Sequence, residues 1–334
     1  MVAAEPLPPP VRTFGSAHPL AFYILRRIAV ALAVLGLVSV LVFAATQVLP
    51  GDAADTILGR SGTAAQKAEL RRELGLDRPL LEQYSSWIRG VLHGDLGRSQ
   101  SSQQPVTTFI SGRLSNSMTL ALVAMIVLFV ISVALGVIAG IRRGHALDHA
   151  ISGTSLALIA LPEFVTGAIL AVVFGVYLAW LPPTSIVLSG SSPLYHPSIL
   201  FLPVLTLCFA GSAYIIRMLR AGVAKEMTSD YVQALRLNGI PEHRVIVRHA
   251  LRNSLAPTVQ VFALTVQWLI GGIVVVETVF SYPGLGQGFV QAVEARDIAV
   301  VQSMTLLIAA IYILINLVAD VVVILLVPKL RTSL

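Results

Sequence analysis

SMTLALVAMIVLFVISVALGVIAGI, residues 117–141, contains no charged side chain over its whole length. A membrane-spanning helix needs about 20 predominantly apolar residues, and this stretch exceeds that length. The chain of 334 residues is 56% hydrophobic and only 12% charged. Because that composition lies outside the range of soluble globular domains, we expect the bilayer to be the solvent of this protein.

Other stretches of the chain are also apolar enough to cross a bilayer. We therefore predict an all-α integral membrane protein with six transmembrane helices, the third of them interrupted by Pro162 and Glu163. Gly136 and Gly140 are small and four residues apart, a spacing that lets one helix pack closely on another. The apolar stretches are residues 28–49, 117–141, 150–181, 198–216, 254–276 and about 298–327.

Basic residues gather at places that share one side of the membrane if the chain crosses it six times. They lie within residues 26–27, 142–145, 217–252 and 329–331. The positive-inside rule assigns this side to the cytoplasm, so we expect a multi-pass protein with both termini cytoplasmic. The segment 50–116 also carries basic residues, but it is longer than the loops to which that rule applies well.

The expected boundaries follow from these apolar stretches and their orientation. They are a flexible cytoplasmic tail at 1–23, a first transmembrane helix at 24–49, an external helical segment at 50–116, a membrane core at 117–328 that includes a cytoplasmic loop at about 217–253, and a cytoplasmic tail at 329–334.

The external segment carries signals for two helices. Thr63 and Gln66 have the spacing of a capping box at a helix start, and Gly75 would end that helix. A second helix is expected at 79–92, with an apolar stripe at helical spacing. This stripe either packs on the external membrane face or against the spans, or it forms a docking platform for another protein. It consists of Leu80, Tyr84, Trp87, Ile88 and Val91.

No motif of nucleotide hydrolysis, metalloprotease or serine hydrolase chemistry occurs in the sequence, so we expect no catalytic residue. The single cysteine, Cys208, lies in an apolar run and is expected in the core. His145 and His149 share a basic turn with Asp148, which we expect to be solvated rather than metal-binding. Basic residues at the ends of apolar runs are explained by membrane topology and do not indicate nucleic acid.

Three acidic residues fall within or at the ends of the apolar stretches. Glu277 and Asp320 can reach a membrane interface by position, whereas Glu163 lies near the middle of its stretch. A lone carboxylate facing lipid is costly, so Glu163 should either line an aqueous path or hydrogen-bond a neighbouring helix. An ion-coupled secondary transporter would use such acids, although the inverted repeats typical of that class are not evident.

The polar segment DYVQALRLNGIPEHRVIVRHALRNSLAP, residues 230–257, lies between two apolar stretches. A short helix should start near Asp230, which is a plausible N-cap, and end at Gly239, with Pro241 just beyond. Because Ala234 and Gly239 are small, such a helix can lie flat in a groove of a partner. The alternative is an interfacial helix surrounded by snorkelling arginines.

Within this segment, DYVQALRLNG and RHALRNSLAP resemble the EAA loop of permease subunits in ATP-binding-cassette (ABC) importers, in the version of the dipeptide and oligopeptide family, B-type subunit. LPGDAAD, LGLDRPLLEQYSSWIRGVLHGDLGRS, ETVFSYPGLGQ and NLVAD match the same family in order. The resemblance covers nearly the whole chain beyond residue 20. It implies a type I ABC importer permease fold and import of dipeptides and oligopeptides, or, within the same family, of nickel chelates or glutathione.

The family resemblance also implies partners. The channel would be completed by a second, homologous permease in the bacterial cell membrane. Two ABC ATPase subunits or domains would dock on the EAA loops, and an extracytoplasmic peptide-binding protein would deliver substrate. This chain would hold no cofactor, because ATP and Mg would be bound by the partner ATPases.

The residues that match the coupling element and the transport path are carried over from the same resemblance. Gln233 and Leu235 stand where the general EAA pattern has glutamate and alanine, and Val327 replaces an aspartate common in the family. The segment at 280–288 is either a gate at the outer end of the path or a plain external turn. The coupling residues are Asp230, Tyr231, Gln233, Ala234, Arg236, Gly239, Arg248, His249 and Asn253, and the path or gate residues are Glu163, Phe280, Tyr282 and Pro283.

Overall fold

The computed structural model describes residues 19–48, 58, 62–73, 76–187 and 191–326, and helices dominate this part of the chain. The only β-type pairing among these residues is an isolated bridge between Arg98 and Pro105. The expected tails and Val327 fall largely or wholly outside the described residues, and so does Gly75. The all-α prediction is confirmed for the part of the chain that is described.

Within the described residues, five helices are long and apolar enough to cross a membrane. They are α2 (Pro19–Val48), α6 (Val106–Ile141), α9 (Pro197–Met227), α12 (Leu251–Val279) and α14 (Ile298–Leu326). Some of these helices start well before the apolar stretches that predicted them, because a helix continues into water whereas hydropathy marks only the membrane-embedded part.

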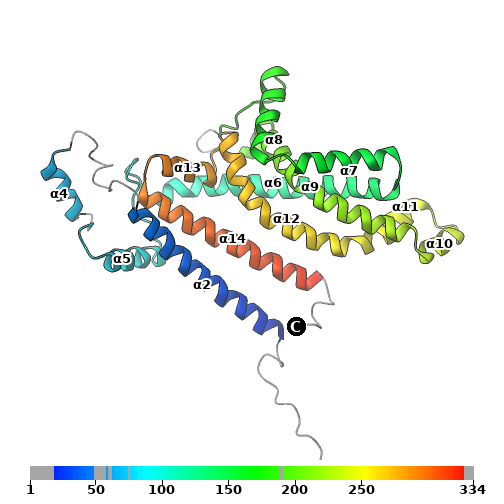
Figure 1. The fold of residues 1–334 in the computed structure, drawn as a ribbon, viewed down its shortest axis with the longest axis horizontal. Coiled ribbons are helices and arrows are strands. Elements are labelled where there is room, and N and C mark those ends of the chain that lie inside the picture. The colour runs from blue at the N-terminus through cyan, green and yellow to red at the C-terminus, as the bar shows by residue number, and fades with distance from the viewer. Residues whose placement is uncertain (1–18, 49–57, 59–61, 74–75, 188–190, 327–334) are drawn as a thin grey trace, which may run out of the picture.

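The third expected span is a broken pair of helices. α7 (Ala146–Ile159) and α8 (Glu163–Leu170), which continues as the π-helix η2 (Ala171–Tyr177), are bent by 108° at the break. Pro162 has no N–H to continue the helix of α7, and its ψ of 146° is extended. The pair brings the number of spans to six if it counts as one. Figure 1 shows α8 turning away from α7 and leaving the bundle.

α9 is the most buried span. In its most apolar window 72% of the residues are buried, against 17% in α2. α6 can lie very close to α9 because glycines face it. A Cβ added at Gly136 would lie 3.0 Å from Leu219 Cβ, and one at Gly140 would lie 2.7 Å from Val223 Cβ. The predicted close packing at these glycines is confirmed.

α2 and α14 lie side by side at the edge of the bundle (Figure 1). Arg27 on α2 forms an ion pair with Asp320 on α14, with an N···O distance of 3.2 Å. At the other end of the pair, Gln302 donates a hydrogen bond to Thr46 at 2.7 Å. Asp320 is thus held by a neighbouring span, a partner that the sequence pattern did not indicate.

The segment between α2 and α6 contains both expected helices, α4 (Ala64–Glu73) and α5 (Leu80–Leu92). The capping box is present, because Gln66 N–H donates to Thr63 Oγ1 at 3.3 Å and Thr63 N–H donates to Gln66 Oε1 at 2.9 Å.

The apolar stripe of α5 packs on the first span. The rings of Tyr84 and Trp87 lie 5.4 and 6.1 Å from the ring of Phe43 on α2, measured between centroids. The Tyr84 hydroxyl hydrogen-bonds the Ser39 hydroxyl at 2.8 Å. Leu80 alone of the stripe remains exposed. Of the two interpretations of this stripe, packing on a span is therefore the one that the structure shows.

Candidate functional site

The polar segment between α9 and α12 forms the short helix α10 (Asp230–Leu237). Ser229, and not Asp230, occupies the N-cap, so the helix begins one residue earlier than expected, with Asp230 as its first residue. Gly239 has a φ of +74°, which a glycine adopts without strain. Gly239 N–H donates to Arg236 O at 2.9 Å and Ile240 N–H donates to Leu235 O at 3.2 Å. This is a Schellman motif, so the predicted stop at Gly239 is confirmed, with Leu237 as the last helical residue.

α10 has one buried and one exposed face. Val232 is fully buried, and the exposed face comprises Asp230, Gln233, Ala234 and Leu237. Leu237 is 90% exposed, an unusual position for a leucine. Because Ala234 carries only a methyl group, this face is flat enough for close contact with another surface. Leu237 was not among the predicted coupling residues, although it follows Asp230 by seven residues and so lies on the same face of the helix.

Side chains tie α10 to the spans on both sides of the loop. The Tyr231 hydroxyl donates to the carboxylate of Glu226, in the last turn of α9. The Asn253 amide, on α12, lies 3.2 Å from Glu226 Oε2 and 3.2 Å from the Tyr231 hydroxyl. Partial burial and the hydrogen bond to Glu226 raise the pKa of Tyr231 above its usual value. Tyr231 and Asn253 therefore contact each other and share Glu226, a residue that no sequence motif singled out.

Arg236 closes the turn that follows α10. Its guanidinium pairs in two-pronged fashion with Glu242 of α11 (Glu242–Arg244), at 3.1 and 2.6 Å. The hydrogen bonds to Glu242 raise the pKa of Arg236. Since the two side chains are 40% and 51% exposed, the pair contributes only about 0.2–1 kcal/mol.

The remaining predicted coupling residues lie on the π-helix η4 (Val245–Ala250), where Arg248 is exposed and His249 is half-buried.

A partly buried ion pair lies at the base of the loop. Arg220 on α9 binds both carboxylate oxygens of Asp148 on α7, and its Nη2 lies 2.6 Å from Asp148 Oδ2. Gly144 N–H also donates to Asp148 Oδ2, at 2.9 Å. Asp148 is fully buried, so the expectation that it lies in a solvated turn is wrong. In this turn the side chains of His145 and His149 are exposed, whereas that of Asp148 is buried against α9.

The segment that follows α12 is a turn built around buried aromatic rings. Phe280 and Tyr282 are fully buried in the main hydrophobic core, and Pro283 is half-buried. The Tyr282 hydroxyl donates to Asn116 O at 2.8 Å, and the Asn116 amide donates to Pro283 O at 2.9 Å. Burial raises the pKa of Tyr282 well above its usual value. In this conformation the Tyr282 hydroxyl and the Pro283 carbonyl fix the turn to Asn116 of α6.

Glu277 anchors the same turn from inside. One carboxylate oxygen accepts from the Ser117 hydroxyl, and the other accepts from Gly286 N–H at 2.6 Å and Gln287 N–H at 3.3 Å. Those N–H groups belong to the first turn of α13 (Leu285–Glu294), where the helix dipole favours an anion. A Cβ at Gly286 would lie 2.5 Å from Val274 Cα. Glu277 is thus a fully buried structural clamp and does not face a membrane interface.

Glu163 begins α8 and lies half-buried against α12. A Cβ at Gly272 would lie 3.1 Å from Glu163 Oε1, and one at Gly167 would lie 3.2 Å from the Phe280 ring. Glu163 and Phe280 therefore belong to the same contact between α8 and the end of α12. Figure 1 shows this contact and α10 at opposite ends of α12, so the predicted site residues form two separate groups.

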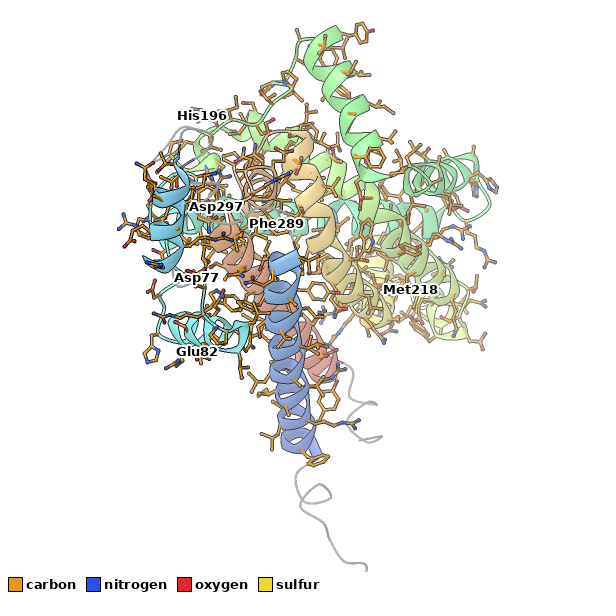
Figure 2. All side chains as sticks on the ribbon, turned by 60° about the vertical axis from the view of Figure 1, so that its left-hand side comes forward. Asp77, Glu82, His196, Met218, Phe289 and Asp297 are labelled. Atoms are coloured by element: carbon orange, nitrogen blue, oxygen red, sulfur yellow. The ribbon has the colours of Figure 1, made fainter. Side chains whose placement is uncertain are left out.

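Asp297 joins the segment between α5 and α6 to the start of α14. Figure 2 shows it between α13 and α14, and its Oδ2 accepts from the Ser99 hydroxyl and from Ser101 N–H at 3.0 Å. Its Oδ1 accepts from Val300 N–H, in the first turn of α14, at 3.3 Å. Burial alone would raise the pKa of Asp297, but the hydrogen bonds from Ser99 and Ser101 outweigh burial and lower it. Among the described residues, no group of three or more His, Cys, Asp or Glu side chains could hold a metal ion.

Comparison with known proteins gives matches along most of the chain. Residues 132–332 match a family described as binding-protein-dependent transport system inner membrane component, and residues 20–122 match the N-terminal part of such membrane components. A Sinorhizobium fredii protein named as a probable peptide ABC transporter permease is 35% identical over 312 residues, covering 92% of this chain and 99% of the relative. The glutathione transport system permease protein of Escherichia coli is 36% identical over 309 residues, covering 92% of this chain and 98% of the relative.

Proposed function

The chain belongs to the family of binding-protein-dependent transport system inner membrane components, and on that premise we propose that it is the permease subunit of an ATP-driven importer of dipeptides and oligopeptides. It is a multi-pass membrane protein and a transport permease. The peptide substrate is supported by relatives that are named for peptide transport and match over nearly their whole length.

The geometry of α10 is the observation that best supports this function. The helix is held between two spans and turns Gln233, Ala234 and Leu237 outward on a flat face. Such a face fits a groove on a soluble ATPase, which would supply the nucleotide chemistry for which this chain has no phosphate-binding motif. Closure of the ATPases on ATP would then push α10 and shift the spans as rigid bodies.

The complete transporter requires further subunits. We expect a second homologous permease, two ABC ATPase subunits or domains that bind ATP and Mg, and an extracytoplasmic peptide-binding protein. No catalytic residue is expected in this chain. We propose that α10 and both termini lie on the cytoplasmic side of a bacterial cell membrane, a topology that the basic residues near α10 support.

The outer end of α12 is our candidate for the end of the transport path. We keep Glu163 as the residue that lines it, since Glu163 is half-buried and lies at the break between α7 and α8. Phe280, Tyr282 and Pro283 would gate the path only by a movement that takes Phe280 away from α8 and breaks the hydrogen bonds of Tyr282 and Pro283 to α6.

Glutathione, itself a tripeptide, is a second candidate substrate because a glutathione permease is as similar to this chain as the peptide permeases are. An ion-coupled mechanism would use Glu163 and Asp320, and it is disfavoured because Asp320 is paired with Arg27. Glu277 is likewise enclosed, by hydrogen-bond donors from α6 and α13.

The test is ATP hydrolysis by the complete reconstituted complex with peptide-loaded binding protein. Ala234→Trp places a bulky side chain on the exposed face of α10, and Ala146→Trp places one at the exposed first residue of α7. We expect Ala234→Trp to lower substrate-stimulated hydrolysis by at least about tenfold, while Ala146→Trp leaves it unchanged and both permeases still copurify.

Full stimulated hydrolysis by Ala234→Trp would refute docking at α10. Replacing the peptide with glutathione, with the matching binding protein, separates the two candidate substrates.

A further inference from the structure

Glu226 is a half-buried acid in the last turn of α9. It lies seven residues before Gln233, which is on the exposed face of α10. It is not on the exposed face of α10, and the coupling motif does not include it. It nevertheless collects hydrogen bonds from both sides of the loop.

A single carboxylate oxygen makes the connection. Glu226 Oε2 accepts from the hydroxyl of Tyr231 on α10 and from the amide of Asn253 on α12. The two donors also lie 3.2 Å from each other. Hydrogen bonds to an ionised acceptor are about twice as strong as neutral ones, so the carboxylate is the strongest point of this triangle.

The backbone at Glu226 holds α10 as well. Only Thr228 and Ser229 separate α9 from α10, and the Ser229 hydroxyl donates to Glu226 O at 2.6 Å. One turn earlier, α9 and α12 are in close contact, since a Cβ at Gly222 would lie 3.0 Å from Ser254 Cβ. The three helices therefore meet around one residue, and α9 and α12 already pack on each other there.

We propose that Glu226 is a positioning residue that makes α10 move as one body with α9 and α12. A push on the exposed face of α10 then reaches two spans at once. This inference rests on the proposed function, because it concerns how an ATPase-driven movement is transmitted.

Removal of the carboxylate leaves weaker links around α10. The hydrogen bond between Asn253 and Tyr231 still joins α10 to α12. Toward α9 there remain the hydrogen bond of the Ser229 hydroxyl to the Glu226 backbone and a long contact, 3.5 Å, from Arg236 Nη1 to Met227 O, but no bond to a carboxylate. When an ATPase pushes α10, the helix then tilts relative to α9, and part of the ATPase movement does not reach the spans. Docking itself should survive, because the exposed face of α10 is unaltered.

The experiment compares Glu226→Ala and Glu226→Gln with Lys225→Ala, a change at the exposed neighbouring residue. Stimulated ATP hydrolysis and peptide uptake are measured in the same proteoliposomes of the complete complex. For Glu226→Ala we expect hydrolysis within about twofold of wild type, and at least about a fivefold rise in ATP hydrolysed per peptide imported. Glu226→Gln should recover the wild-type ratio to within about twofold, because an amide oxygen still accepts both hydrogen bonds. Lys225→Ala should match wild type.

Hydrogen–deuterium exchange of residues 230–237 provides a second readout on the same complexes. We expect faster exchange in Glu226→Ala than in wild type and Lys225→Ala. An unchanged ratio of ATP to peptide in Glu226→Ala would overturn the inference, even if exchange increases, because Glu226 would then only stabilise the loop. Loss of hydrolysis together with loss of subunit copurification would also overturn it.

A wild-type complex without substrate-stimulated hydrolysis would refute the proposed function itself. The wild-type sample therefore distinguishes failure of the proposed function from failure of the inference about Glu226.

Discussion

Asp148, Glu277 and Asp297 are buried acids, and each accepts hydrogen bonds from groups far away in the sequence. Asp148 binds Arg220, Glu277 binds Ser117 and the start of α13, and Asp297 binds Ser99. A buried charge without such partners would cost several kcal/mol, on the order of the desolvation penalty of the ion. These acids are therefore structural, and each fixes one contact between elements.

Asp297 allows a test of this role by pH. Because folding lowers the pKa of Asp297 below the unfolded value of about 3.9, its ionised form contributes stability at higher pH. That contribution is fully present above the unfolded pKa and is lost as pH falls through the folded pKa. We expect Asp297→Asn to lower the free energy of unfolding by about 1–3 kcal/mol at pH 7, and by much less near pH 3. Thermal unfolding of the purified chain in detergent measures the difference.

The matched control for Asp297 is Asp77→Asn, because Asp77 is an exposed acid (Figure 2) and its substitution should change little at either pH. If Asp297→Asn were equally destabilising at pH 7 and pH 3, the charge of the carboxylate would have no part in the effect.

At the scale of elements, the break between α7 and α8 and the ion pair at the start of α7 determine the course of the third span. Pro162 ends one helical direction, and Glu163 starts another with a favourable charge at the helix N-terminus. Asp148 meanwhile holds α7 on α9 through Arg220. α7 is thus attached to the span that leads into the α10 loop.

Breaking that ion pair should loosen α7. Asp148→Asn removes the charge partner of Arg220, and we expect a loss of about 1–3 kcal/mol in the free energy of unfolding, less than for a fully buried pair because the Arg220 side chain is 30% exposed. The double variant Asp148→Leu with Arg220→Met should lose less than Asp148→Asn, since it leaves no unpaired charge. Thermal unfolding in detergent measures both. A double variant less stable than the single one would show that the pair contributes more than it costs to bury.

At the scale of the whole molecule, the two groups of candidate site residues lie at opposite ends of α12. α10 and its hydrogen-bonded network lie at the start of that helix, and the buried turn with Phe280 and Tyr282 lies at its end. α12 and the central span α9 are therefore the direct connection between the exposed face of α10, where we propose that an ATPase docks, and the proposed outer end of the path.

The orientation of the molecule can be tested by labelling. Cys208 is buried and its replacement by Ala gives a background without cysteine. Single cysteines at the exposed positions Asp77 and Gln104 should react with a membrane-impermeant maleimide in intact spheroplasts, whereas those at Arg143 and Asn238 should react only in inside-out vesicles. Labelling of all four from the same side would contradict the expected topology.

The sequence by itself determined the features that depend on local chemistry. Long apolar runs gave the membrane class and the spans, because transfer into lipid depends on the composition of the run itself. The capping box at Thr63, the break at Pro162 and the stop at Gly239 were also predicted correctly, since each arises from hydrogen bonds and dihedral angles within a few residues.

Only the tertiary structure decided which distant side chains meet. Glu226 and Asn253 lie on different spans, as do Ser117 and Glu277, and Ser99 is separated from Asp297 by most of the chain. The burial of Phe280 and Tyr282 depends in the same way on α6 and on the packing of several helices. No local pattern marks such pairs, because their free energy comes from packing and from the exclusion of water between helices, which exist only once the bundle has formed.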